Sequence, residues 1–185
     1  MELFRNFRLS RGRSVLKNKS SRIKRTRFKG NILTAKKIGL LWDASDPDEF
    51  QVLSHFHQLM QERNIDLEIM GYYPGKAIPD RITAIRYLVC LKNEDLNWTY
   101  RPVSREAVRF ISTPFDILID ANFRNQFPLE YMSTLSVAGL KAGLYSKSDD
   151  QSHYDIMIDT GGDKDLNKYL DQVVHYLELI NTGSK

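Results

Sequence analysis

Six short apolar runs alternate with segments that have the apolar spacing of amphipathic helices, and this alternation restricts the chain to few folds. The runs span residues 36–42, 67–73, 86–91, 115–120, 141–145 and 154–159. Parallel strands joined by helical crossovers are covered on both faces, so they read as continuous apolar runs. We therefore expect an α/β fold, a three-layer sandwich around a mostly parallel, Rossmann-like sheet of about five to six strands.

Local signals predict where several helices begin and end. Asp46, followed by proline, is the expected N-cap of the first helix of the body, and Ser104 of a later one. Pro128 is predicted to open a helix that Gly139 closes. The intervening loop over residues 93–102 is expected to bury its tryptophan, Trp98.

The charge of the chain is divided between two segments of opposite sign. The first 29 residues carry eleven Lys or Arg side chains and one acid, a net charge of +10, while the other 156 carry 16 basic and 22 acidic side chains, a net of −6. A stretch of such charge density is expected to stay solvated, so we predict a basic arm over residues 1–30 and a single α/β domain over residues 31–185. Gly12 and the pair Ser20–Ser21 are predicted to weaken any long helix in the arm.

The basic arm predicts a polyanionic partner. RNA or the ribosome is the favoured partner, because basic segments interleaved with aromatic residues order on contact with RNA. An anionic membrane surface is the alternative, with Leu3, Phe4 and Phe7 inserting into the lipid. The candidate polyanion-binding residues are Arg5, Arg8, Arg11, Arg13, Lys17, Lys19, Arg22, Lys24, Arg25, Arg27 and Lys29.

Three of the predicted strands end in an aspartate, namely Asp43, Asp120 and Asp159. Strand ends of a parallel sheet share one edge, where ligands bind, so these carboxylates either hold a magnesium ion or order the loops that follow them. Asn122 and Arg124 follow directly, and Arg124 either clamps an anion or pairs with a neighbouring acid. A small-molecule or nucleotide-binding enzyme that uses this edge is a further alternative.

The chain contains no recognisable reaction motif. It lacks a G-x-G-x-x-G or Walker sequence, an H-E-x-x-H zinc motif and a G-x-S-x-G elbow. Its single cysteine, Cys90, lies in an apolar run and is expected to be a buried small side chain. We therefore expect a non-enzymatic binding protein with no catalytic residue, metal, cofactor or identified small-molecule substrate.

Two features of the sequence bear on location. A single cysteine cannot form an internal disulfide, which favours a reducing compartment. No apolar stretch approaches the roughly 20 residues that cross a bilayer. The expected location is the cytoplasm, with the periphery of the inner membrane as the alternative.

The sequence also resembles two protein families. Residues 37–43, 71–73, 115–122, 127–131 and 142–144 resemble a family of small uncharacterised Bacteroidota proteins, catalogued as a domain of unknown function. That resemblance covers nearly the whole chain, basic N-terminus included, and implies no activity. Residues 116–120, 133–139 and 142–143 are similar to the N-terminal lobe of heptosyltransferase-like glycosyltransferases. Those enzymes bind their donor mainly in a second α/β lobe, so this similarity implies the fold rather than the activity.

Overall fold

The computed structural model describes residues 2–83, 85–145 and 153–180. One sheet of six strands runs through it in the order β3-β2-β1-β4-β5-β6, and every pairing is parallel. The strands are β1 (Lys37–Asp43), β2 (Asp66–Tyr72), β3 (Leu88–Leu91), β4 (Ile117–Ala121), β5 (Leu140–Leu144) and β6 (Ile156–Ile158). The predicted α/β class is confirmed. The strand order reverses between β1 and β4, and such a switch point is where parallel sheets offer a binding crevice.

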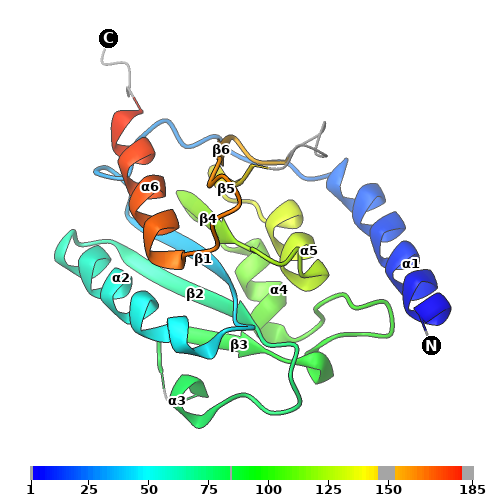
Figure 1. Cartoon of the computed structure of the whole chain (residues 1–185). Coiled ribbons are helices and arrows are strands. Elements are labelled where there is room, and N and C mark those ends of the chain that lie inside the picture. The colour runs from blue at the N-terminus through cyan, green and yellow to red at the C-terminus, as the bar shows by residue number, and fades with distance from the viewer. Residues whose placement is uncertain (1, 84, 146–152, 181–185) are drawn as a thin grey trace.

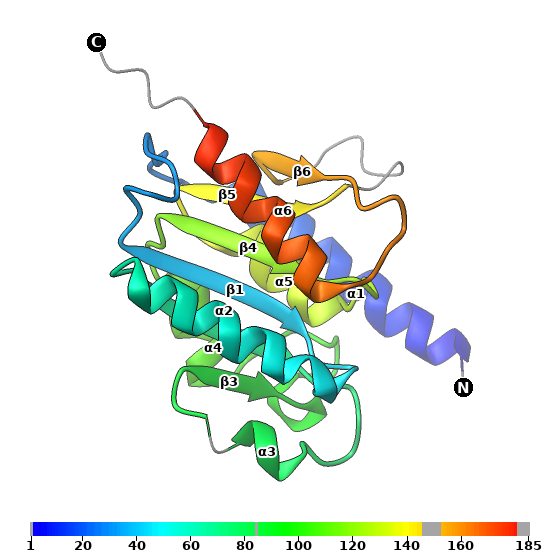
Figure 2. The ribbon, with the colours of Figure 1, turned by 60° about the vertical axis from the view of Figure 1, so that its left-hand side comes forward.

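Helices cover both faces of the sheet, with α2 and α6 on one face and α4 and α5 on the other (Figures 1 and 2). The helices are α1 (Glu2–Ser20), α2 (Phe50–Glu62), α3 (Asp80–Thr83), α4 (Arg105–Ser112), α5 (Phe127–Leu135) and α6 (Leu166–Leu179). None of them, within the described part of the chain, combines the length and the apolar character that a bilayer crossing requires.

The central strand β1 explains why the strands read as continuous apolar runs. Leu40 and Trp42 pack into the core under α2 and α6, while Leu41 packs into the core under α4 and α5. All three are fully buried. Because successive side chains point to opposite faces, a strand covered on both sides has no solvent-facing positions for polar residues.

The predicted helix starts agree with the structure, but one predicted helix end does not. Asp46 accepts a hydrogen bond from the N–H of Asp48 and caps a 3-10 turn, Pro47–Glu49, that leads directly into α2. Ser104 accepts one from the N–H of Ala107 and caps α4. α5 ends at Leu135, whereas Gly139 lies beyond it and directly against the backbone of Phe28. Gly139 therefore permits a close chain crossing rather than terminating the helix.

The predicted burial of Trp98 is wrong, since its exposed fraction is 57%. The side-chain oxygen of Asn97 accepts hydrogen bonds from the N–H groups of Thr99 and Arg101 and closes a tight loop. Trp98 lies at the tip of that loop, where no described element covers it. Asparagine frequently organises turns in this way.

The basic N-terminus is more ordered than the sequence predicts. Residues 2–20 form the 19-residue helix α1, which lies against α5 (Figure 1). Leu16 is buried against Phe127, Tyr131 and Leu135. A side chain at Gly12 would bring its Cβ to 2.6 Å from the carbonyl oxygen of Thr99 and 2.8 Å from the ring of Phe127. Gly12 was expected to weaken a helix, yet here it lets the helix backbone approach the domain.

The segment that follows α1 is attached to the domain along its length. The N–H of Phe28 donates to the carbonyl oxygen of Gly139. Ile32 is fully buried. The N–H groups of Lys36 and Lys37 both donate to Asp116, at 2.7 and 3.0 Å. We call residues 22–36 the strap, because this segment connects α1 to β1 across the edge of the sheet near β5 and β6 (Figure 2).

A substitution at Gly12 tests whether α1 is docked or merely helical. Gly12→Ala raises the intrinsic helix propensity by about 1 kcal/mol but places a methyl group against Thr99 and Phe127. We expect this variant to lose hydrogen-exchange protection of amides in the second half of α1. Ser14→Ala, at an exposed position of the same helix, is the control and is expected to keep that protection. Equal or greater protection in Gly12→Ala would contradict the docked arrangement.

Candidate functional site

A cleft of about 840 Å³ opens at the carboxyl edge of the sheet, beside α1. Asp120 of β4 and Asp159, which follows β6, line it from the sheet side. Arg13 and Lys17 line it from α1. The basic segment and two of the predicted edge aspartates, which the sequence places far apart, therefore meet in one cleft.

Asp120 is the deepest ionisable group of this cleft, with an exposed fraction of only 1%. Its Oδ2 accepts a hydrogen bond of 2.6 Å from the hydroxyl of Tyr154, while its Oδ1 is buried without a hydrogen-bond partner among the described residues. Burial raises the pKa of Asp120 to about 6, and the hydrogen bond from Tyr154 limits the rise. The ring of Tyr154 lies over Gly143, where any larger residue would overlap it.

Asp43, in contrast, is fully occupied in ordering the loops at the switch point. Its Oδ1 accepts a 3.1 Å hydrogen bond from the N–H of Ser45. Its Oδ2 accepts one of 3.1 Å from the N–H of Arg124 and lies 3.5 Å from the guanidinium of that residue. Of the two roles predicted for Arg124, the structure thus has the pairing with a neighbouring acid.

The remaining predicted edge residues divide between a loop and the cleft. Asn122 exchanges two hydrogen bonds with the backbone of Gln126, the residue that caps α5, so its amide shapes the turn. Asp159 is exposed and lies across β5 from Asp120, about two strand spacings or roughly 10 Å away. Across residues 2–83, 85–145 and 153–180, no three His, Cys, Asp or Glu side chains gather as metal ligands would.

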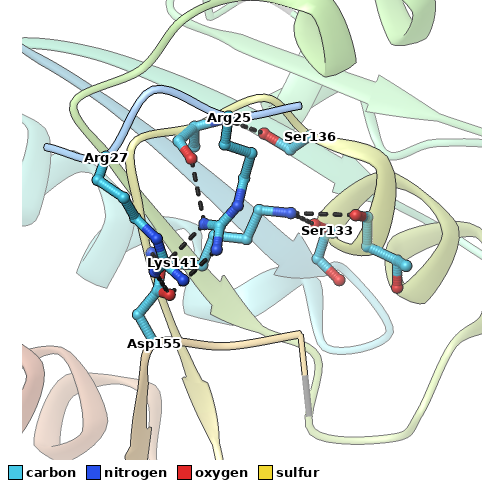
Figure 3. A network of polar contacts seen from close by, with 8 residues as sticks. Arg25, Arg27, Ser133, Ser136, Lys141 and Asp155 are labelled. Carbon is cyan, nitrogen blue, oxygen red and sulfur yellow. Dashed lines mark hydrogen bonds and ion pairs between the residues drawn. The ribbon is translucent and has the colours of Figure 1, made fainter. Parts of the chain in front are cut away.

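Lys141 is a buried cation on the face of the sheet that α5 covers. Its ammonium donates to the carbonyl oxygens of Ser133 and Thr134, at 2.6 and 3.0 Å (Figure 3). These carbonyls belong to the last turn of α5, where the helix dipole favours a cation. Burial nevertheless lowers the pKa of Lys141 to about 7, and the charge of Arg25 adds to this effect.

His153 lies beside the same helix end and the same cleft. Its Nε2 is 2.8 Å from the hydroxyl oxygen of Ser133. Burial, together with the charge of Lys141, lowers the pKa of His153 to about 3, so the ring is neutral at physiological pH. Ser133 is buried and, unlike Asp120, does not line the cleft, so the pair is structural.

Asp155 joins the strap to the sheet (Figure 3). It forms a bidentate ion pair with Arg25, at 2.9 and 3.0 Å, and a second ion pair with Arg27. It also accepts a 2.8 Å hydrogen bond from the N–H of Lys141, while Arg25 donates to the carbonyl oxygen of Ala138. Arg25 and Arg27 therefore stabilise the contact between the strap and the sheet.

The other basic residues of the N-terminus point mostly to solvent. Arg8 donates to the carbonyl oxygen of Trp98, and Arg13 lies 3.9 Å from Glu130. Seven more are exposed and form no ion pair with a described residue; these are Arg5, Arg11, Lys17, Lys19, Arg22, Lys24 and Lys29. The predicted polyanion-binding set thus separates into an outward group and a group used within the fold.

Sequence reasoning missed Lys141, Tyr154 and Asp155. Lys141 had one visible signal, because a lysine inside an otherwise apolar strand needs polar partners. Tyr154 and Asp155 carried no such signal, since their roles depend on strand order. Cys90 is half-buried rather than buried as predicted, and it packs against the core. The burial that it has raises the pKa of its thiol to about 12, which disfavours a nucleophilic thiolate.

Comparison with known proteins places the chain in one family. The model of a family of unknown function (DUF6913) matches residues 10–180. The match covers most of α1, the strap and the sheet. No curated protein matches the chain.

Removing Lys141 should flatten the pH dependence of stability. Between pH 7 and the ordinary lysine pKa of 10.5, the unfolded chain holds a proton that the folded chain has lost, so stability rises with pH. The site contributes at most about 1.4 kcal/mol per pH unit. We expect Lys141→Met to lose this slope between about pH 7 and 8.5 in urea unfolding, relative to the native chain.

Lys168→Met is the control for that measurement. Lys168 is exposed on α6, and its hydrogen bond to Asp163 raises its pKa, so it does not titrate in this window. Its slope should match that of the native chain. An unchanged slope in Lys141→Met would show that Lys141 stays fully charged in the folded protein.

Proposed function

The chain belongs to this family of unknown function, and we propose that it is a non-enzymatic binding protein that binds RNA, free or in the ribosome, through the outer surface of α1 and the strap. The sheet is the rigid scaffold that presents this surface. We place the protein in the cytoplasm. The observation that carries the proposal is the set of seven exposed cations without an ion-pair partner among the described residues.

Those cations are suited to phosphate contacts. They lie on one continuous segment, from Arg5 to Lys29, that is already held against the domain. A preformed surface orders fewer side chains on binding than a disordered arm does. Cations that are not paired within the protein lose no internal ion pair when they meet phosphates. Each such contact releases counterions from the nucleic acid and favours binding.

Exposed aromatic rings beside these cations favour RNA in particular. Phe4 and Phe7 have exposed fractions of 65% and 52%, and Trp98 lies nearby on the loop that α1 contacts through Arg8. The guanidinium of Arg8 lies 4.2 Å from the ring centroid of Tyr100 and lines a smaller hollow of about 400 Å³ with Trp98. Unpaired bases stack on such rings, while a duplex does not expose its bases.

A membrane surface is less well supported than RNA. The apolar side chains that α1 leaves exposed, Leu3, Phe4 and Phe7, are confined to its first two turns. Leu16, which would extend an apolar face further along the helix, is buried against α5. Helices that lie in the interface of a bilayer present an apolar face along their length.

Salt dependence tests the proposal. Four exposed cations, Arg5, Arg11, Lys19 and Arg22, are changed together to glutamine. The affinity for a single-stranded RNA oligonucleotide is measured by fluorescence anisotropy over a range of salt concentrations. If each residue contacts one phosphate, the slope of log affinity against log salt should fall by about 3.

The control variant removes the same charge elsewhere, at the exposed residues Lys76, Arg86, Arg105 and Lys168. Its slope should stay close to that of the native chain. Equal slopes in all three proteins would contradict a binding surface on α1. Binding to vesicles of anionic lipid, with none to RNA, would replace RNA by a membrane.

A further inference from the structure

The cleft beside α1 has two chemically different sides, and it shares Lys17 with the cations of the proposed RNA surface. The sheet side carries Asp120 and Asp159, whereas the α1 side carries Arg13 and Lys17. We propose that this cleft binds a small phosphorylated polyol, such as a sugar phosphate. Its hydroxyl groups are bound by Asp120, and its phosphate by Arg13 and Lys17.

Asp120 provides the acceptor at the base of the cleft. One of its oxygens is occupied by Tyr154, and the other, Oδ1, has no hydrogen-bond partner among the described residues. A buried carboxylate oxygen without a donor costs free energy that a ligand hydroxyl recovers. The hydroxyl of Tyr154 has one proton, which it already donates to Oδ2. The hydroxyl of Ser133 and the N–H of Asn122 help to lower the pKa of Asp120, but neither forms a hydrogen bond with Oδ1, so a ligand hydroxyl can supply that donor.

The α1 side provides the cations. The side chain of Arg13 is 62% exposed and lines the cleft, with its guanidinium 3.9 Å from Glu130, which lines it too. Lys17 is exposed and forms no ion pair with a described residue. An arginine beside a lysine is suited to a phosphate monoester, which takes a bidentate contact from the one and a point charge from the other.

The acidic side chains of the sheet side determine how the ligand is oriented and how many phosphate groups it can carry. The sheet side of the cleft carries three carboxylates, Asp120, Asp159 and Asp163, and one cation, Lys164. The α1 side carries two cations, Arg13 and Lys17, and one acid, Glu130 of α5. A second phosphate at the sheet side would therefore meet a net negative charge and be repelled. Hydroxyl groups, in contrast, donate to carboxylates. The cleft therefore selects a ligand with one anionic end and one hydroxyl-bearing end.

Isothermal titration calorimetry of the full chain tests this site with three probes, namely D-ribose phosphorylated on its primary hydroxyl, free D-ribose, and inorganic phosphate. The phosphorylated sugar should bind at one site per chain. Each of the other two should bind at least about tenfold more weakly, because each lacks one set of contacts. No saturable binding of the phosphorylated sugar would overturn the proposal, and so would equal binding of inorganic phosphate.

Variants locate the site. Arg13→Glu with Lys17→Glu, and separately Asp120→Asn, should each weaken the phosphorylated sugar by about tenfold or more. The exposed double substitution keeps the test informative if the buried one prevents folding. Arg11→Glu with Lys19→Glu, on the same helix but outside the cleft, is the matched control and should change the affinity by less than about twofold. Unchanged binding in the Arg13 and Lys17 variant would overturn the assignment to this cleft.

The two proposals fail separately. The Arg11 and Lys19 control lies on the proposed RNA surface, so it should weaken RNA while leaving the sugar phosphate bound. Loss of RNA binding alone would leave the cleft proposal intact, and the reverse also holds.

Discussion

The attachment of a highly basic segment to an acidic domain depends on one carboxylate, that of Asp155. It receives Arg25, Arg27 and the N–H of Lys141 at the start of β5 and β6. The pair with Arg25 is sheltered from solvent, with both side chains 15% exposed, so it is screened less than a surface ion pair. Without this contact the strap would be held by backbone hydrogen bonds, by Ile32 and, at its end, by the carboxylate of Asp116. Because the strap begins directly after α1, its attachment to the sheet also determines where α1 and its side chains lie.

α1 gains its place from packing rather than from its own helical tendency. A long, basic helix containing glycine is marginal in isolation. Leu16 and the close approach at Gly12 fasten one side of it to α5 and to the loop around Thr99. The docked helix then has two sides that can each bind an anion, because its outer surface presents unpaired cations while Arg13 and Lys17 line the cleft. A bound polyanion and a bound small molecule would both stabilise the same docked position, which links them thermodynamically.

The sequence predicted what local pattern determines and missed what depends on contacts between distant segments. The strands were predictable because a strand covered on both faces must be apolar, as in β1, and the starts of the helices because Asp46 and Ser104 are capping residues. The docking of α1 was not, since Gly12 is a weak helix position until Thr99 and Phe127 are seen beside it. Trp98 was assigned to the core on residue type alone, whereas the turn around Asn97 decides its exposure.

The candidate site shows the same division. Three aspartates at strand ends were expected to share an edge, and the strand order gives each of them a different role. Asp43 orders loops, Asp120 forms the base of the cleft and Asp159 lies at its far side. Proximity at an edge therefore did not make a metal site. A strand-end carboxylate keeps an oxygen without a hydrogen-bond partner where no cation can reach it, whereas Arg124 reaches Asp43.

Lys141 and Asp120 explain why an unused carboxylate can persist in the core. They lie on the same face of neighbouring strands, without direct contact. Burial disfavours the charged form of each side chain. The positive charge of Lys141 limits the rise in the pKa of Asp120, and the negative charge of Asp120 limits the fall in the pKa of Lys141. With its pKa held to about 6, Asp120 is mostly ionised at neutral pH. It therefore remains an acceptor, mainly because hydrogen bonds such as that from Tyr154 limit the rise in its pKa, with a smaller contribution from the charge of Lys141.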